Sequence, residues 1–496
     1  MTNRQSYRQI FKATSLFGAV QVVNVLTGII RSKFVAIFLG PTGMGVSALL
    51  LSSVTLVITV VSLGINFSAV RDISRANESG DKEELNVIVT IFKRWLWVSC
   101  IFGTIVLISL SPIISSIAFG DRAYTLSLIL LSLMAIFTLL TNGNIALLQG
   151  TRKLNYAANS TVIGSLLALF TSIPLYYFYG TKGIVPALIF SAVITFMVTE
   201  YFARKVSVSS RNVSRKETVG VGMAMAKLGM VMMLGQILGS VVVYFINLVI
   251  RSKGGMADVG LYQAGTMITN QSIGLVFTAM SMDYFPRLSV VSNDSEKVNE
   301  MVNQQATITV LIASPLLISL IIFAPIIIHI LLSPQFYVIS NFVRWLAFGT
   351  LFTAPAVVLG YIALAKGDKK SYFLYCTVYN SLFSIFFYLG GYLLNGLDGL
   401  AIGMCVFQIA YGIFLSIKFN YLYSFSFNKQ FIILFCIIGL FCLCAMISVF
   451  LLKGIPGYLL GGVILISSSI YSWRRLDNLI GIKIHIVEKI SNFRRK

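Results

Sequence analysis

Apolar residues follow one another in long, uninterrupted stretches along most of the chain, and they do not alternate with polar residues. A helix that crosses a membrane needs about 20 mostly apolar residues, whereas the strands of an outer-membrane barrel alternate apolar and polar positions. The pattern therefore predicts an all-α polytopic membrane protein with fourteen transmembrane helices. The predicted helices cover residues 10–39, 42–70, 94–117, 123–149, 156–179, 183–203, 227–250, 259–285, 305–332, 341–365, 371–394, 398–420, 430–452 and 455–473.

The composition excludes a soluble globular protein. Of the 496 residues, 57% are hydrophobic and only 11% are charged, against about 25% charged residues in ordinary soluble domains. A soluble fold of this composition would have too little polar surface to cover its apolar residues. Six cysteines lie within the apolar stretches and show no metal-binding spacing, so we expect them to pack as small apolar side chains.

The charge is strongly basic, with 38 Lys and Arg residues against 17 Asp and Glu residues and a net charge of +21. When successive segments are assigned to alternate sides of the membrane, 30 of the 38 basic residues fall on the side of the two termini. Basic residues accumulate in cytoplasmic loops. We therefore predict a multi-pass protein of the bacterial cytoplasmic (inner) membrane with both termini cytoplasmic, and the charge calls for no nucleic-acid partner.

An internal repeat divides the chain. Short stretches in the first half match stretches in the second half at offsets of 216 to 220 residues, always at equivalent ends of predicted helices. The matching pairs are 145–153 with 362–370, 180–183 with 396–399, and 30–33 with 250–253. Because each unit holds six helices, both copies enter the membrane in the same orientation and are related by a pseudo-twofold axis along the membrane normal.

The repeat predicts two six-helix lobes, made of helices 1–6 and 7–12, followed by helices 13 and 14. The predicted parts are an N-lobe at 1–203, a basic cytoplasmic linker at 204–226, a C-lobe at 227–420, helices 13–14 at 421–473 and an amphipathic basic tail at 474–496. Transporters built from parallel repeats bind their substrate between the repeats and move one against the other.

Two motifs resemble a known family. Gly28–Gly45 reads GIIRSKFVAIFLGPTGMG, and Leu148–Lys153 reads LQGTRK. Both resemble the O-antigen and polysaccharide flippase branch of the multidrug/oligosaccharidyl-lipid/polysaccharide exporter superfamily, in which Leu-Gly-Pro-x-Gly-x-Gly follows a basic first helix. The length and the arrangement of six, six and two helices are also similar to that branch.

The resemblance implies a MATE-like fold with a central cavity. It implies translocation of an undecaprenyl-pyrophosphate-linked oligosaccharide, such as an O-antigen repeat unit for lipopolysaccharide, to the outer leaflet by alternating access. It further implies coupling to an ion gradient or to the membrane potential, and as partners the lipid bilayer, a polysaccharide polymerase and a chain-length regulator. The sequence contains no nucleotide-binding Gly-x-x-x-x-Gly-Lys-Ser/Thr loop, and we expect no cofactor, no metal and no enzymatic activity.

Basic residues inside the first and seventh helices are the candidates for substrate binding. Asn24, Gly28 and Arg31 follow one helical stripe at i, i+4 and i+7, and the second lobe repeats this stripe. A guanidinium pairs well with pyrophosphate, so we expect Arg31 and Arg251 to face each other across the lobes. The alternative is that these side chains reach outer-leaflet headgroups. The predicted substrate-binding residues are Arg31, Arg251, Lys33, Lys253, Asn24 and Asn247.

Two further groups of polar residues lie in the apolar segments. Asp283 is a candidate for ion coupling, although its position near Arg287 is more typical of a cytoplasmic interface residue. The amides are expected mostly to join helices, while some could contact sugar hydroxyls. These amides are Gln21, Asn66, Asn142, Asn144, Asn159, Gln236, Asn270, Gln271, Asn380 and Gln408.

Three other functions stay open at this point. A multidrug or cation antiporter of the same superfamily would need acidic residues in its cavity, and this chain has few. A lipid II flippase would share the helix count and the basic residues. A polysaccharide polymerase or ligase would be an enzyme with a sizeable outer loop carrying catalytic residues, and all predicted outer loops are short.

Overall fold

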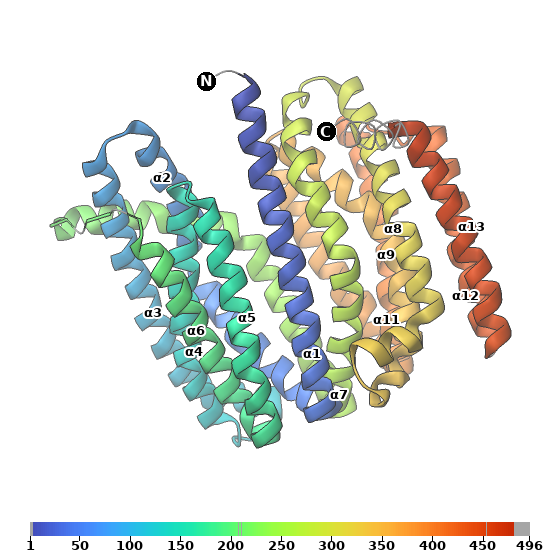
Figure 1. Ribbon diagram of the computed structural model, residues 1–496, viewed down its shortest axis with the longest axis horizontal. Coiled ribbons are helices and arrows are strands. Elements are labelled where there is room, and N and C mark those ends of the chain that lie inside the picture. The colour runs from blue at the N-terminus through green and yellow to red at the C-terminus, as the bar shows by residue number, and fades with distance from the viewer. Residues whose placement is uncertain (1–2, 207, 210, 453, 481–496) are drawn as a thin grey trace, which may run out of the picture. The chain divides into compact units, whose positions relative to one another are not determined.

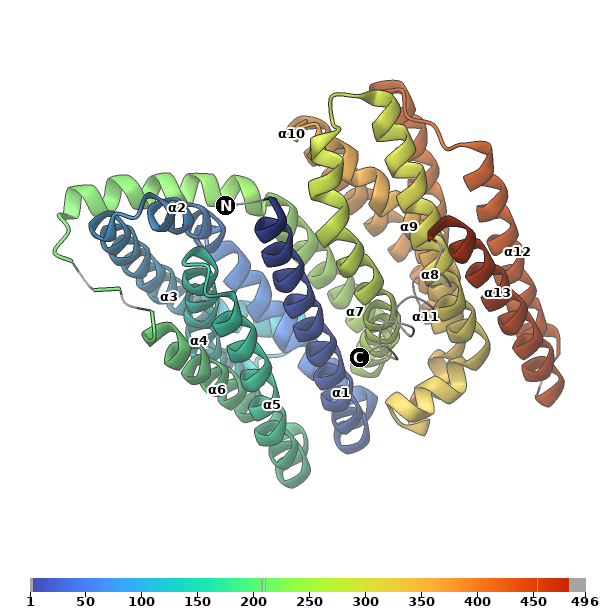
Figure 2. The same cartoon turned by 45° about the horizontal axis from the view of Figure 1, so that its top comes forward.

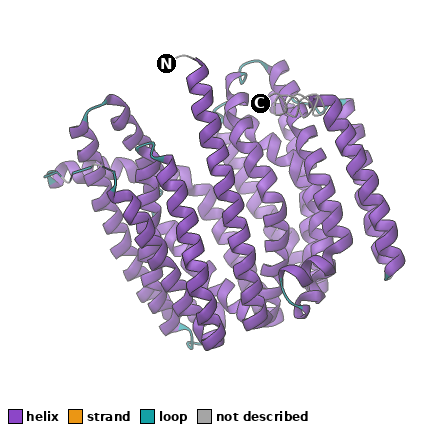
Figure 3. Ribbon diagram, viewed as in Figure 1, coloured by secondary structure: helices purple, strands orange, loops and turns teal. Residues whose placement is uncertain are grey.

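The computed structural model describes residues 3–206, 208–209, 211–452 and 454–480. This part of the chain is almost entirely helical and contains no strand (Figure 3), which confirms the all-α class for it. The chain divides into two compact units. Unit 1 comprises Met1–Gln263 with Leu331–Ser333, and unit 2 comprises Ala264–Ile330 with Pro334–Lys496. The lobe boundaries expected from the repeat stay a prediction.

Unit 1 is a bundle in which α5 packs against α6 and α1, and α4 packs against α3 and α6 (Figure 1). Its small apolar residues allow this close packing. Its elements are α1 (Asn3–Val61), α2 (Ile65–Ser79), α3 (Lys82–Phe119), α4 (Thr125–Gly150), α5 (Leu154–Tyr179), η1 (Gly180–Gly183), α6 (Ile184–Arg204) and the first part of α7 (Arg215–Val290).

Unit 2 contains the rest of α7 and the later helices, among which α11 packs against α9 and α12 against α13 (Figure 2). The short element η3 is a π-helix and joins α10 to α11. The elements are α8 (Ser295–Leu331), η2 (Pro334–Ile339), α9 (Ser340–Ala365), α10 (Lys369–Ser371), η3 (Tyr372–Tyr379), α11 (Asn380–Tyr423), α12 (Lys429–Leu451) and α13 (Ile455–Ile480).

The described residues hold ten helical stretches that are long and apolar enough to cross a membrane, so the protein is a multi-pass membrane protein. Ten is fewer than the fourteen predicted, and the higher count is not confirmed. The difference has a physical origin in four stretches of 42, 51, 46 and 55 residues, each about twice the 20 residues that one crossing needs. Each of these stretches contains a break where the sequence predicts a boundary. The backbone is non-helical at Gly40, Gly255 and Gly396, and η1 separates α5 from α6.

Glycines make these bends. Gly40 (φ 63°, ψ −170°) interrupts α1, and Gly255 (φ 84°, ψ −173°) interrupts α7 in nearly the same conformation. Gly180 (φ 53°, ψ −133°) ends α5, and Gly396 (φ 55°, ψ −139°) interrupts α11. Backbone of this kind is essentially restricted to glycine. The two conformations thus recur 215 and 216 residues apart, close to the offsets of the sequence repeat.

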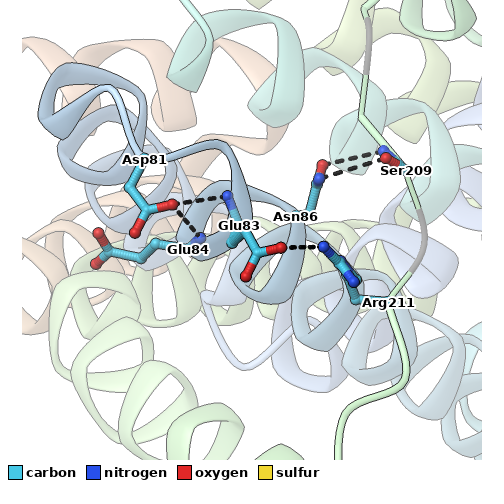
Figure 4. Close-up of polar contacts among 6 residues, drawn as sticks. All are labelled: Asp81, Glu83, Glu84, Asn86, Ser209 and Arg211. Carbon is cyan, nitrogen blue, oxygen red and sulfur yellow. Dashed lines mark hydrogen bonds and ion pairs between the residues drawn. The ribbon is translucent and has the colours of Figure 1, made fainter.

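The polar stretch at 71–93, expected to be a loop, is mostly helical. α2 continues to Ser79, and α3 begins only three residues later because Asp81 caps it. The Asp81 carboxylate accepts hydrogen bonds from the backbone N–H groups of Glu83 (2.8 Å) and Glu84 (3.3 Å) (Figure 4). Side-chain caps of this type stabilise a helix start even in polar sequence.

The segment that leads into α7 is held on α3. The Ser209 N–H donates to the Asn86 side-chain oxygen (3.0 Å), and the Asn86 amide donates back to the Ser209 hydroxyl (3.3 Å). Arg211 pairs with Glu83 (Figure 4), and the Trp95 indole donates to the Thr218 carbonyl at 2.8 Å. These contacts fix part of the predicted 204–226 linker to unit 1.

Within unit 1, the backbone of α7 touches α1 and the break after α1 at two places. A Cβ on Gly45 would overlap the Met256 carbonyl, and a Cβ on Gly260 would overlap the Pro41 carbonyl. A Cβ on Gly64 would likewise overlap the Gly229 backbone. Any side chain at these glycines would push the two helices apart, so glycine is required there for close approach.

Candidate substrate-binding site

Arg31 occupies a half-buried position on α1 and points toward α6. Its Nη2 donates to the Ser191 hydroxyl at 3.3 Å, and its charge also interacts with Tyr176, a buried residue of α5. Arg31 belongs to none of the ion pairs that form among the described residues. A guanidinium that has only neutral partners keeps its charge and several N–H donors for an anion.

The amides predicted on the same helical stripes have buried side-chain oxygens. Those of Asn24 and Asn247 are both enclosed and have no hydrogen-bond partner among the described residues. Asn247 is only 1% exposed. A buried acceptor that is left unpaired costs free energy, so a substrate-binding role for either asparagine stays a prediction.

Arg251 is differently placed. Its Nη2 donates to the Phe119 carbonyl at the C-terminal end of α3, and its guanidinium lies against Gly120, whose φ is +79°. The exposed carbonyls at a helix C-terminus attract cations. Arg31 and Arg251 both belong to unit 1, yet they contact α6 and α3 respectively. In this conformation Arg251 therefore ties α7 to α3, and a role in substrate binding stays a prediction.

The remaining predicted site residues are Lys33, Lys253 and Asp283, and the structure says less about their surroundings. Lys33 is partly exposed on α1, and Lys253 is exposed on α7, close to the Gly255 bend. Asp283 belongs to α7, but its side chain lies outside the described residues. Among the described residues no group of three or more His, Cys, Asp or Glu gathers in a way that could hold a metal ion.

Sequence reasoning missed a cavity of about 400 Å³ inside unit 2. It lies among α9, η3 and α11, and two of the listed amides, Asn380 and Gln408, contribute to it. The tyrosines that line it gave no signal, because 22 tyrosines are spread over the chain and their common location depends on the fold. The lining residues are Thr353, Ala356, Val357, Gly360, Tyr361, Leu364, Tyr372, Cys376, Asn380, Tyr388, Phe407, Gln408 and Tyr411.

The sequence also matches a family model, described as polysaccharide biosynthesis protein, over residues 34–341. The chain belongs to this family. The match covers more than half of the 496 residues and includes most of unit 1 together with the start of unit 2. It confirms the resemblance that the two motifs indicate.

Curated relatives of the family are flippases and transporters by name. The chain is 20% identical to the lipid III flippase of Escherichia coli (strain K12) over 364 residues, which cover 73% of this chain and 87% of the relative. It is 24% identical to a putative O-antigen transporter of Shigella flexneri over 362 residues, covering 72% and 84%. Neither name describes an enzyme.

Solved structures share the fold. The lipid II flippase MurJ in an inward closed conformation superposes with a TM-score of 0.70 at 16% identity, covering 93% of this chain and 99% of that one. An inward-facing multidrug resistance MATE family transporter gives a TM-score of 0.65 at 18% identity, with coverages of 82% and 98%. At these identities the likeness concerns the fold, which is MATE-like as expected.

Proposed function

We propose that this protein is a flippase that moves an undecaprenyl-pyrophosphate-linked oligosaccharide to the outer leaflet of the bacterial cytoplasmic membrane. Membership of the polysaccharide biosynthesis family carries this proposal. The relatives named as a lipid III flippase and a putative O-antigen transporter support the substrate class. The protein performs transport by alternating access rather than covalent chemistry, driven by an ion gradient or the membrane potential.

The proposed topology has fourteen crossings with both termini in the cytoplasm. The bends at Gly40, Gly255 and Gly396 and the short turn η1 each divide one of the four long apolar stretches. Two crossings from each of these four and one from each of the other six give fourteen. The excess of basic residues on one side supports the cytoplasmic orientation of the termini.

In the proposed mechanism Arg31 binds the pyrophosphate. Its half-buried position and neutral partners support this role, because a charge-assisted contact to phosphate is strong where water is partly excluded. Asn24 and Asn247 supply acceptors nearby on the helical stripes, and Lys33 and Lys253 add positive charge. Arg251 contributes mainly by fixing α7 to α3, and Asp283 is the proposed ion-coupling residue.

The proposal is tested by deleting the gene in its own host and isolating the lipid-linked intermediates. We expect a pyrophosphate-linked oligosaccharide to accumulate, because synthesis on the inner leaflet continues while export stops. Re-expression of the wild-type chain should clear it. A polymerase or chain-length regulator, proposed as a partner, would act only on the exported product.

Other outcomes of this experiment identify the competing functions. Accumulation of lipid II would assign the chain to peptidoglycan export. An unchanged lipid pool together with increased sensitivity to cationic drugs would contradict the proposal and favour a multidrug antiporter.

A further inference from the structure

The cavity inside unit 2 is not used by the proposed pyrophosphate site. We propose that it binds one part of the oligosaccharide itself, an uncharged pyranose unit, through hydroxyl-directed hydrogen bonds and ring packing. This inference rests on the proposed function and extends it by assigning the sugar portion of the substrate to a site of its own. The volume of about 400 Å³ falls in the range of small-ligand sites, roughly 300–1,000 Å³.

The lining combines neutral polar groups with aromatic rings. Four tyrosines, two amides and one threonine face the cavity, and the set contains no charged side chain. An anionic pyrophosphate or a metal cation would find no counter-charge among these residues. A sugar ring, in contrast, offers hydroxyls to the amides and phenols and an apolar face to the aromatic rings.

Two polar atoms of the lining residues have no hydrogen-bond partner in the described part of the chain. The Gln408 Oε1 and the Thr353 Oγ1 are each enclosed and make no hydrogen bond to any described residue. Burying such groups unpaired is unfavourable, and both belong to the cavity lining. In the proposed complex these two side chains turn toward the bound ring, and its hydroxyl donors pair with the two oxygens.

The aromatic walls are held in place by their neighbours. The Tyr361 ring packs edge-on against Tyr284, with centroids 5.7 Å apart, and the buried Tyr284 hydroxyl donates to the Val358 carbonyl at 3.4 Å. On the other wall Phe407 and Tyr411 stack at 5.5 Å. A site whose rings are already fixed loses little conformational entropy when a ligand binds.

The π-helix η3 presents the third wall. Tyr372, Cys376 and Asn380 follow one another at four-residue intervals along or directly after η3, and all three face the cavity. π-helical turns are rare and frequently occur at functional sites.

The turn before η3 is fixed by Asp368. Its carboxylate accepts the Ser371 N–H at 3.0 Å and the Tyr423 hydroxyl at 2.9 Å. These hydrogen bonds, led by the one from the Ser371 backbone, hold the pKa of Asp368 below its usual value. The start of η3 is therefore anchored at neutral pH.

A direct test uses the purified full-length chain in nanodiscs and three probes. The probes are the lipid-linked oligosaccharide isolated from the host, undecaprenyl pyrophosphate without sugar, and tetraphenylphosphonium as an organic cation. Gly360→Leu fills the cavity, because a Cβ there would meet only the Cys376 sulfur at 3.7 Å. Gly439→Leu in α12 is the matched control, since a Cβ at Gly439 meets nothing within 4 Å and the residue lies outside the cavity.

A second pair of variants removes one acceptor. Gln408→Leu deletes the unpaired amide of the cavity, and Gln271→Leu deletes an unpaired buried amide elsewhere in unit 2. We expect Gln408→Leu to bind the oligosaccharide lipid about five- to tenfold more weakly, the value of one or two hydrogen bonds. Gly360→Leu should weaken binding at least as much, because its side chain occupies the cavity. Binding of undecaprenyl pyrophosphate should stay within twofold, and both controls should behave as wild type.

The melting temperature separates binding from folding. Gln408→Leu should change it little, because the amide oxygen that the variant removes makes no hydrogen bond to any described residue. The inference is overturned if the two cavity variants bind the oligosaccharide lipid as tightly as wild type, while the flippase proposal then stands. It is also overturned if tetraphenylphosphonium alone binds and depends on the cavity. Failure of wild type to bind either lipid would overturn both proposals.

Discussion

At the residue scale, the two arginines predicted as a pair have different surroundings. Arg31 has the neutral Ser191 hydroxyl as its hydrogen-bond partner, whereas Arg251 caps a helix end through the Phe119 carbonyl. Helical periodicity places each arginine on a stripe with an asparagine. It contains no information on which neighbouring helix the side chain meets, because that depends on packing between segments far apart in the sequence. The role of Arg251 as a cap could not be predicted for this reason.

These surroundings predict that substitution of Arg31 affects transport, whereas substitution of Arg251 affects stability. Arg31→Ala should reduce clearance of the lipid-linked oligosaccharide about 10- to 100-fold, as expected for loss of charge-assisted contacts worth about 1.5–3 kcal/mol, with little change in melting temperature. Arg251→Ala should destabilise the protein by about 1–2 kcal/mol by uncapping α3. Both are measured by in vivo complementation at equal expression and by thermal unfolding in detergent.

The exposed Arg122 provides the matched control for the loss of a positive charge in unit 1. Arg122→Ala should change neither the clearance of the lipid-linked oligosaccharide nor the melting temperature. If Arg31→Ala cleared the intermediate at the wild-type rate, pyrophosphate binding by Arg31 would be wrong. An unchanged melting temperature for Arg251→Ala combined with lost transport would instead assign Arg251 to the substrate.

At the element scale, the sequence predicts where helices bend more reliably than where they end. The boundaries expected near residues 40, 255 and 396 all fall at glycines with positive φ. At each of them the backbone leaves the helical conformation and a second helix begins, so two apolar helices are joined by a kink where the sequence predicts a boundary. The polar stretch at 71–93 is mostly helical because a local cap, Asp81, outweighs its polar composition. The hydropathy pattern alone contains no information about such a cap.

The backbone conformation at the bends predicts that replacing their glycines with alanine lowers the stability of the protein. At Gly180 and Gly396 a Cβ would meet no atom within 4 Å, so Gly180→Ala and Gly396→Ala introduce no clash. Each should nevertheless lower the free energy of unfolding by about 1–3 kcal/mol, because alanine is strained in this backbone conformation. Thermal or denaturant unfolding of the purified variants measures the effect.

Gly439→Ala is the control for these two variants. Gly439 also has open space around its Cβ position but lies in the regular helix α12. Alanine there should be neutral or stabilising by up to about 1 kcal/mol. Equal stability of all three variants would show that the glycines at 180 and 396 are not required for their backbone conformation.

At the scale of the whole molecule, family membership, a MATE-like fold and multi-pass topology agree with what composition and two short motifs predict. Composition suffices for the class because a chain with 57% hydrophobic residues has few alternatives to the membrane. The unit 2 cavity could not be predicted, since its lining residues span positions 353 to 411 on three elements. The proposed pyrophosphate contact of Arg31 belongs to unit 1, and the proposed sugar site belongs to unit 2.

Transbilayer movement in reconstituted vesicles tests the central claim most directly. The lipid-linked oligosaccharide from the host is placed in vesicles with the purified chain, and its exposure to an impermeant lectin is followed after an ion gradient is imposed. The account predicts faster exposure with wild type than with protein-free vesicles, and at least about tenfold slower exposure with Arg31→Ala. Exposure no faster than in protein-free vesicles, from a sample that transports tetraphenylphosphonium, would contradict it.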